Sequence, residues 1–484
     1  DIFMLTISEK EILDRLNFDN PWWEDKDTSI NHSKHPKRKY FFEFYENILD
    51  RSVNRALVLM GPRRVGKTVM VMQSISELIH KDSIDNKKIL FLSLETPIYT
   101  GIGLEKLLNI FNSLHGHKRN DELYIYFDEI QYLRDWEVHL KSLVDSYPNY
   151  KFVVTGSAAA ALRLKSNESG AGRFSDYILP PLTFAEYLSF INKEAELVTY
   201  IEEFESIDDR YSTNNIEELN KEFVNYLNYG GYPETVFSEK IRENQSQYIK
   251  SDIIDKVLLR DLPSLYGIND IQELNRLFTT LAYNTGQEVS LDGLSKDSGV
   301  AKNTIKRYLE YLEAAFLIKR VERIDNNCKR FKRANFFKIY LTNPSMRAAL
   351  FGQIDPNSQH MGALTETAIY SQWQHGNIDS LYYARWDNGE IDIVYLNDLQ
   401  KPQWFIEIKW TDRPFSDHKE LDNCITFKRK NPNLSGDSIL VTSKTIDDEL
   451  TYRDELFVFK PSSLYAYIVG FNSLKRMRTR KKES

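Results

Sequence analysis

Apolar runs alternate with helix-like patterns between residues 56 and 180. The apolar runs, each of a length suited to a strand, are Ala56–Met60, Lys88–Leu94, Leu123–Phe127, Phe152–Thr155 and, more weakly, Tyr177–Leu179. The helix-like patterns are Lys67–His80, Leu104–Leu114 and Trp136–Ser146. Alternation of this kind is typical of a mainly parallel sheet covered by helices on both faces. We therefore expect an α/β fold in this part of the chain.

The hydrophobic and polar pattern divides the chain into six segments. Residues 1–50 are polar and aromatic and form a lead-in to the alternating core at 51–183. Residues 184–270 are charged and helical, residues 271–345 hold shorter helices and two strand-like runs, and residues 346–470 are mixed α/β. Residues 471–484 form a basic tail, and we expect its strongly basic part, Lys475–Lys482, to be disordered.

A phosphate-binding motif follows the first apolar run. Gly61-Pro62-Arg63-Arg64-Val65-Gly66-Lys67-Thr68, with Val69 after it, matches G-x-x-x-x-G-K-T between a strand and a helix. The glycines let backbone N–H groups curl around phosphate oxygens, and the helix start adds positive charge. We expect all nine residues to bind nucleotide, with Lys67 on the β and γ phosphates and Thr68 ligating Mg²⁺. ATP and Mg²⁺ are the predicted cofactors.

Two adjacent acids end another apolar run. Leu123–Phe127 leads into Asp128 and Glu129, about 60 residues after the phosphate loop. We expect Asp128 to hold the Mg²⁺ and Glu129 to polarise the attacking water as a catalytic base. Two solvent-facing acids at the end of a buried strand would give the same pattern. The catalytic interpretation is favoured because the phosphate-binding motif Gly61–Thr68 is also present.

Further catalytic candidates are a hydroxyl and an arginine. Ser157, after the Phe152–Thr155 run, is positioned to hydrogen-bond the attacking water, and Thr155 is the second choice. Arg173 lies in a loop of small residues and would neutralise transition-state charge in its own or a neighbouring subunit, and Arg163 competes for that role. An ordinary turn and surface arginines fit these positions about equally well.

Several of these segments carry a family resemblance. GPRRVGKT, IYFDEIQYL, VVTGS, GRF with LPPLTFAEYL, and YGGYPE resemble AAA-superfamily ATPases of bacteria and archaea that join an N-terminal ATPase to a C-terminal domain of long-unassigned function. The resemblance implies a P-loop AAA-type parallel sheet of the additional-strand, central-glutamate class. It also implies that residues 184–270 form a helical lid.

The segment 271–345 has a winged helix-turn-helix pattern. Leu291 and Leu294 begin a short helix, Gly299 supplies a turn, and Lys302–Ala315 is amphipathic. Leu317–Ile324 and Asn335–Leu341 would be wing strands joined by a basic loop, Asn327–Arg333. The same module occurs in the family just named. A basic helix and wing suit a DNA groove and its phosphates, although such modules also serve as contacts between protein domains.

Two alternating runs predict a hairpin with acids on one face. Gly389–Tyr395 and Gln403–Lys409 flank a turn at Asn397–Pro402, so Asp392 would face Glu407, and Glu390 would face Lys409. Carboxylates directly opposite one another repel, and a divalent cation would relieve that repulsion. A solvated charged face with a weak Glu390–Lys409 pair is the alternative.

The spacing Asp–x(14)–Glu–x–Lys resembles the PD-(D/E)xK, or restriction-endonuclease-like, nuclease fold. The resemblance implies that Asp392 and Glu407 hold Mg²⁺ and that Lys409 stabilises the attacking hydroxide or the developing charge. Glu366, in a helical pattern, matches the helix acid of that fold. The proline usual before the first acid is replaced here by Glu390-Ile391.

Composition narrows the picture further. The net charge of -7 excludes a uniformly basic surface, so nucleic-acid binding must be local. Cys328 and Cys424 are far apart and suit a reducing compartment. No apolar run approaches the roughly 20 residues of a membrane span. We expect a cytoplasmic protein without membrane contact.

These patterns support two hypotheses about function. The first is an ATP hydrolase coupled to a Mg²⁺-dependent nuclease-like domain that acts on nucleic acid, DNA in preference to RNA, in defence or mobile-element maintenance. The second is a non-cleaving ATP-dependent switch or DNA-binding regulator. A homo-oligomer is an expected assembly in either case.

Overall fold

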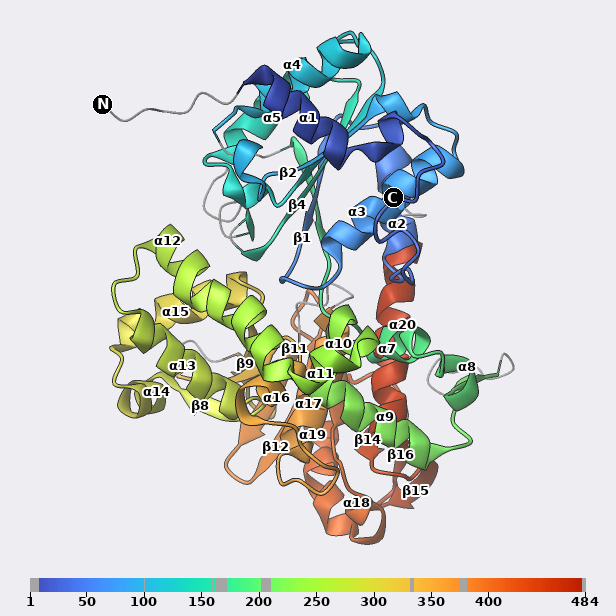
Figure 1. Cartoon of the computed structure of the whole chain (residues 1–484). Helices are drawn as coiled ribbons and strands as arrows, with labels where there is room; N and C mark the ends of the chain where they lie inside the picture. Colours follow the sequence, from blue (N-terminus) through green and yellow to red (C-terminus); the bar gives the residue numbers. More distant parts are fainter. Residues whose placement is uncertain are drawn as a thin grey trace. The chain divides into compact units, whose positions relative to one another are not determined.

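The computed structural model describes residues 8–99, 101–158, 160–161, 172–201, 210–330, 335–374 and 381–480. The chain forms two compact units, Asp1–Leu179 and Pro180–Ser484 (Figure 1). Among the described residues, no helix has the length and apolar character needed to cross a membrane.

The N-terminal unit is built on a five-stranded parallel sheet, as the alternating pattern predicted. The strand order is β2-β3-β4-β1-β5, so β4 is central and β1 lies between β4 and the edge strand β5. All described residues of β1, β3 and β4 are buried, which explains their continuous apolar character. The strands are β1 (Ala56–Met60), β2 (Ile89–Ser93), β3 (Leu123–Asp128), β4 (Tyr150–Gly156) and β5 (Phe174–Ile178).

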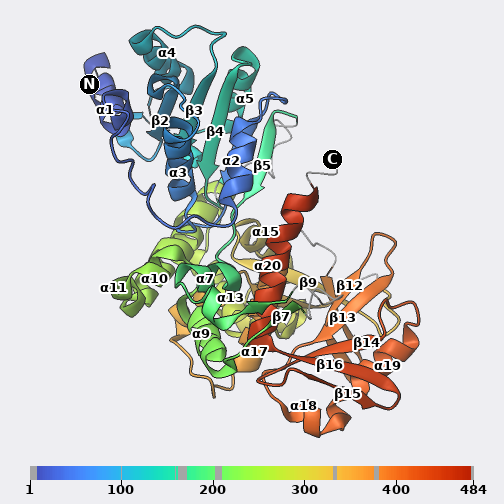
Figure 2. The same cartoon turned by 90° about the vertical axis from the view of Figure 1, so that its right-hand side faces the viewer.

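Helices flank this sheet, and the lead-in packs on it (Figure 2). At the edge strand β2, the Asn20 side chain accepts from the Phe91 N–H at 2.7 Å and donates to the Phe91 carbonyl at 2.8 Å. The lead-in thus satisfies backbone groups that an edge strand would expose. The helices are α1 (Glu9–Asp19), α2 (Phe41–Leu49), α3 (Lys67–His80), α4 (Leu104–His115) and α5 (Trp136–Ser146).

The C-terminal unit is built on a mixed nine-stranded sheet of order β15-β16-β14-β13-β12-β11-β9-β10-β8. Its strands are β8 (Glu288–Ser290), β9 (Ile318–Ile324), β10 (Phe336–Leu341), β11 (Leu381–Trp386), β12 (Gly389–Leu396), β13 (Pro402–Glu407), β14 (Ser438–Ser443), β15 (Asp448–Tyr452) and β16 (Glu455–Pro461). A separate pair joins β6 (Thr199–Tyr200) to β7 (Tyr211–Ser212).

The two strands expected to form a wing pair with each other and also join the larger sheet. β9 pairs with β10 as a hairpin, and its other edge pairs in parallel with β11. The predicted lid, winged-helix and nuclease-like segments therefore belong to one compact unit. Pairing the free edge of β9 satisfies its N–H and C=O groups, which the local pattern did not foresee.

Helices cover this sheet and extend beyond it. They are α7 (Phe184–Phe190), α8 (Glu194–Leu197), α9 (Ile216–Tyr229), α10 (Pro233–Phe237), α11 (Glu239–Glu243), the π-helical η7 (Ser246–Asp255) and η8 (Val257–Asp261), α12 (Leu262–Tyr266), α13 (Ile271–Tyr283), α14 (Leu291–Ser298), α15 (Lys302–Ala314), α16 (Ser345–Phe351), α17 (Met361–Trp373), α18 (Arg413–Ser416), α19 (Asp422–Lys430) and α20 (Ser462–Arg480). Helix α20 continues to Arg480, so it includes residues 475–480 of the segment that we expected to be disordered.

Candidate functional site

The phosphate-loop residues Gly61–Gly66 connect β1 to α3. A Cβ at Gly61 would lie 2.3 Å from the Leu179 carbonyl oxygen, so no side chain fits there. Gly66 has φ of 98°, a left-handed conformation that glycine adopts without steric cost, and it caps α3. No side chain caps the first N–H groups of α3. Those donors are therefore placed to receive an anion.

Lys67 and Thr68 begin α3 beside the loop and β3. The Lys67 ammonium donates to the carbonyl oxygens of Gly61 at 3.1 Å and Pro62 at 2.7 Å. Burial lowers the pKa of Lys67, and the nearby carboxylates of Glu129 and Asp128 oppose that effect. The Thr68 hydroxyl lies 3.1 and 3.0 Å from the two carboxylate oxygens of Asp128. The predicted metal-binding hydroxyl and acid are thus brought together.

Asp128 ends β3, and Thr155 of β4 lies beside it. The Thr155 hydroxyl donates to Asp128 Oδ1 at 2.6 Å and accepts from the Glu129 N–H at 3.0 Å. Burial, with a further contribution from Glu129, raises the pKa of Asp128 to about 6. A carboxylate that is costly to ionise in isolation is stabilised by a bound cation.

Glu129 is held by a glutamine that the sequence patterns did not single out. Gln131 donates from Nε2 to Glu129 Oε2 and accepts from the Ser157 N–H at 3.3 Å. The Ser157 hydroxyl is buried and has no hydrogen-bond partner among the described residues. Ser157 therefore joins this network through its backbone, and Thr155 is the residue whose side chain contacts the acids.

Arg173 lies at the other end of the sheet from the phosphate loop. It precedes β5, whose first residue, Phe174, pairs with Ala56 at the start of the parallel strand β1. The loop follows the far end of β1, a strand length of roughly 16 Å away. Arg173 forms an ion pair with Asp145 at 2.6 Å. The structure does not bring Arg173 to the loop of its own chain, and Arg163 lies outside the described residues.

In the C-terminal unit, the hairpin of β12 and β13 has the predicted register. Ile393 pairs with Ile406, which puts Asp392 opposite Glu407. The Asp392 N–H donates to Glu407 Oε2 at 3.4 Å, and the Ile408 N–H donates to Asp392 Oδ2 at 2.8 Å. The two acids predicted to share a metal ion are neighbours.

Lys409 and Glu390 have partners other than each other. The Lys409 ammonium contacts Glu407 Oε1 at 2.7 Å, and Glu390 contacts Lys338 at 2.7 Å. The expected Glu390–Lys409 pair is therefore wrong. Glu407 ends β13, so Lys409 has left the strand and turns back toward Glu407.

Lys338 of β10 is the residue that sequence analysis missed. It is 2% exposed, and its ammonium lies 2.9 Å from Glu366, 2.7 Å from Glu390 and 3.7 Å from Asp392. The Tyr340 hydroxyl also donates to Glu366. The sequence signal for Lys338 was its position as the one charged residue in the otherwise apolar and aromatic run FFKIYL. Lys338 thus places a buried positive charge among three carboxylates.

These groups line an acidic cavity of about 520 Å³. Burial raises the pKa of Glu366 to about 7, and burial with the neighbouring Asp392 raises that of Glu407 to about 8. Within the described ranges, no three His, Cys, Asp or Glu side chains are grouped so as to hold one metal ion. Asp392 and Glu407 form a two-carboxylate pair, and the Lys338 ammonium separates Glu366 from them.

The amphipathic helix α15 has the predicted faces. Ile305, Tyr308, Leu309 and Leu312 are buried. Lys302, Asn303, Lys306 and Arg307 are exposed. Gly299 has φ of 73° and separates α14 from α15. Part of the basic loop that follows β9, residues 331–333, lies outside the described residues.

Two family models match this chain. Residues 53–188 match a model described as an AAA domain, and residues 220–357 match one described as a domain of unknown function (DUF8612). The AAA match, the phosphate loop and the parallel five-stranded sheet identify the core of the N-terminal unit as a P-loop domain of AAA type. The C-terminal unit has the mixed sheet expected from its pattern.

Three curated relatives match, each an uncharacterized protein. One from Haemophilus influenzae is 27% identical over 308 residues, which are 62% of this chain and 70% of the relative. Two from Methanocaldococcus jannaschii, MJ1544 and MJ1637, are 26% and 22% identical over 60% and 63% of this chain. The matches span 60% and 65% of those two relatives.

Solved structures give only distant likenesses. The Aeropyrum pernix ORC1 protein in complex with DNA has a TM-score of 0.29 at 11% identity, over 68% of this chain and 95% of that one. C. elegans PCH-2 has a TM-score of 0.27 at 14% identity, over 50% and 66%. The replication initiator DnaA bound to AMPPCP and single-stranded DNA has 0.24 at 13% identity, over 57% and 86%.

Proposed function

We propose that the protein binds ATP at Gly61–Val69 and hydrolyses it with the help of Mg²⁺. The observation that carries this proposal is the contact of the Thr68 hydroxyl with both Asp128 oxygens, beside the uncapped start of α3. A hydroxyl and a buried carboxylate are hard oxygen ligands that suit Mg²⁺. The bound ion would neutralise phosphate charge as a Lewis acid.

Each residue of the site then has a defined task. Lys67, which contacts loop carbonyls, would release them to bind the β and γ phosphates. Glu129 would orient the attacking water and take its proton, and Gln131 would keep that carboxylate in place. Arg173 would act on nucleotide only from a neighbouring subunit of a homo-oligomer, because in its own chain it lies at the end of the parallel strands opposite the phosphate loop.

We further propose that the C-terminal unit cleaves nucleic acid, with DNA as the favoured substrate. The support is the Asp392–Glu407 pair with Lys409 within 2.7 Å of Glu407, inside an acidic cavity. Asp392 and Glu407 would hold Mg²⁺, and Lys409 would stabilise charge on the attacked phosphate. The exposed basic face of α15 would contact the backbone of the duplex. A cytoplasmic location suits both activities.

One observation favours a second candidate function. Lys338 lies among Glu366, Glu390 and Asp392, where it neutralises acids that a nuclease would use to hold metal. A C-terminal unit stabilised in this way would bind nucleic acid without cutting it, and the protein would be an ATP-dependent switch or DNA-binding regulator.

A cleavage assay separates the two candidates. Plasmid, linear and single-stranded DNA, and RNA, are incubated with Mg²⁺ or Mn²⁺, with and without ATP. The nuclease proposal predicts metal-dependent cleavage that Lys409→Ala abolishes and Lys401→Ala retains, because Lys401 is exposed at the hairpin tip. Identical cleavage by wild type and Lys409→Ala would reject the nuclease and leave the switch.

A further inference from the structure

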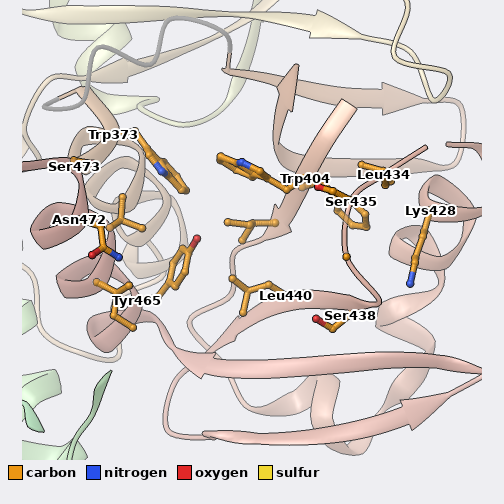
Figure 3. A pocket seen from close by; sticks show the side chains of 15 residues that line it. Trp373, Trp404, Lys428, Leu434, Ser435, Ser438, Leu440, Tyr465, Asn472 and Ser473 are labelled. Carbon is orange, nitrogen blue, oxygen red and sulfur yellow. The ribbon is translucent and has the colours of Figure 1, made fainter. Parts of the chain in front are cut away.

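A second cavity lies on the C-terminal sheet, away from the acids. It has a volume of about 330 Å³ and lies between strands β13 and β14 and helices α17 and α20 (Figure 3). Trp404 and Leu440 project from the strands, and Trp373 and Tyr465 project from the helices (Figure 3). No described residue lines both this cavity and the acidic one. The two are distinct sites on one sheet.

Stacked aromatic rings form one wall of this cavity. The rings of Trp373 and Trp404 have centroids 5.5 Å apart and are inclined by 28°, and Trp404 also stacks on Tyr395 at 5.3 Å. Tyr465 meets Trp373 edge-on at 6.2 Å. Because these rings stack on one another, they form a rigid wall, and a flat ligand would contact its exposed ring edges at little entropic cost.

Polar groups without protein partners face the same space. Neither the Trp373 nor the Trp404 indole N–H donates a hydrogen bond to any described residue, and the half-buried Asn472 amide also makes none. Together they offer two ring donors and one amide that both donates and accepts. A ligand with hydrogen-bonding groups around its edge would satisfy them.

Charge in the cavity is already neutralised. Lys428 is the one charged side chain among the described lining residues, and it pairs with Glu455 at 2.7 Å and donates to the Asp437 carbonyl oxygen at 3.1 Å. An anion would have to compete with Glu455 for it. The volume is near the lower limit of the roughly 300–1,000 Å³ of small-molecule sites. The ligand is therefore small, flat, uncharged and polar at its edge.

We propose that this cavity binds a single nucleobase. Nucleobases are flat and neutral, carry donors and acceptors around the ring, and stack on aromatic side chains. The base has two sources, a free nucleoside or an unpaired nucleotide of a single strand. The proposal depends on neither ATP hydrolysis nor cleavage, because it rests on residues outside both sites.

The test is calorimetric titration of the full chain carrying Lys67→Ala, which removes phosphate-loop binding. Adenosine, guanosine, cytidine and uridine lack phosphate, and a short single-stranded oligonucleotide supplies the second source. We expect saturable binding of at least one nucleoside, weakened roughly tenfold by Trp404→Leu, because the variant lacks the indole N–H and the ring edge that would contact the base. The matched control is Trp386→Phe, since Trp386 stacks on Phe427 away from the cavity and should bind as the parent does.

A second cavity variant and a competition experiment complete the test. If circular dichroism shows that Trp404→Leu is misfolded, Asn472→Leu replaces it and should weaken nucleoside binding while retaining the fold. Competition between nucleoside and oligonucleotide assigns the unpaired base as a source, and nucleoside binding alone assigns the free nucleoside. Absence of nucleoside binding, or equal binding by the parent and the folded cavity variant, would overturn the proposal.

Discussion

Glu129 combines a strained backbone with a carboxylate that is held in place. Its φ of 52° is left-handed, a region that costs a non-glycine residue about 1 kcal/mol, and Gln131 fixes its side chain. The Glu129 N–H also donates to Thr155, which in turn contacts Asp128. Strain that neighbours maintain in this way suits a residue whose orientation matters to catalysis.

We predict that Glu129→Gln binds ATP but hydrolyses it roughly 100-fold more slowly or worse, because the amide cannot take a proton from water. Phosphate release measures the rate, and a fluorescent ATP analogue measures binding. Glu122→Gln is the matched control, since Glu122 is exposed and precedes the opposite end of β3. Undiminished phosphate release by Glu129→Gln would remove Glu129 from the role of base.

Because the pKa of Glu407 is raised, we predict that metal binding at this site depends on pH. The Glu407 pKa is raised from 4.5 to about 8 by burial and by Asp392, so in the metal-free protein Glu407 holds a proton at higher pH than a free glutamate does. A metal ion must displace that proton, and affinity should rise as pH increases toward 8, by at most about tenfold per unit. The metal-free fold binds this proton more tightly than the unfolded chain, so its unfolding free energy should fall as pH rises from 4.5 to about 8.

Calorimetric titration of Mn²⁺ at several pH values measures the first effect. Proton release on binding, obtained by repeating the titration in buffers of different ionisation enthalpy, should disappear in Glu407→Gln. Affinity that does not change with pH, or proton release that persists in the variant, would contradict this account of Glu407.

Among helices and strands, local pattern predicted more than long-range pairing. The parallel strands of the N-terminal unit and the register of β12 and β13 followed from alternation and turn length. The pairing of β9 with β11 did not, because these strands are far apart in sequence and nothing local specifies the partner of a strand edge. For the same reason the sequence indicated the acids of β12, β13 and α17 and Lys409 but not Lys338, which lies on β10.

Lys338 of β10 is the basis of a prediction about stability. Removing the charge in Lys338→Met leaves the nearby carboxylates repelling one another in a buried cavity, and breaking a buried ion pair costs about 3–5 kcal/mol. The melting temperature of the variant should fall in EDTA and recover in Mg²⁺ or Mn²⁺, because a divalent cation replaces the missing charge. Lys401→Met, at the exposed hairpin tip, should melt like the wild type. Equal melting of Lys338→Met and wild type in EDTA would show that Lys338 does not neutralise the acids.

For the whole chain, the phosphate loop and the C-terminal acids belong to different compact units. Each unit has its own sheet, and each set of functional side chains is held by elements of its own unit. We therefore expect a single substitution to remove one proposed site without unfolding the unit that holds the other. A loss of ATP binding should leave the fold of the C-terminal unit intact.

The central claim is that Lys67, Thr68 and Asp128 bind a magnesium-bound nucleoside triphosphate, and calorimetric titration of ATP with Mg²⁺ tests it most directly. We predict saturable heat for the wild type and affinity roughly 30-fold weaker or worse for Lys67→Ala, since hydrogen bonds to charged groups contribute about 1.5–3 kcal/mol. Lys81→Ala, at the exposed far end of α3, should bind as the wild type does. No binding heat from folded wild-type protein, or equal affinity for wild type and Lys67→Ala, would contradict the claim.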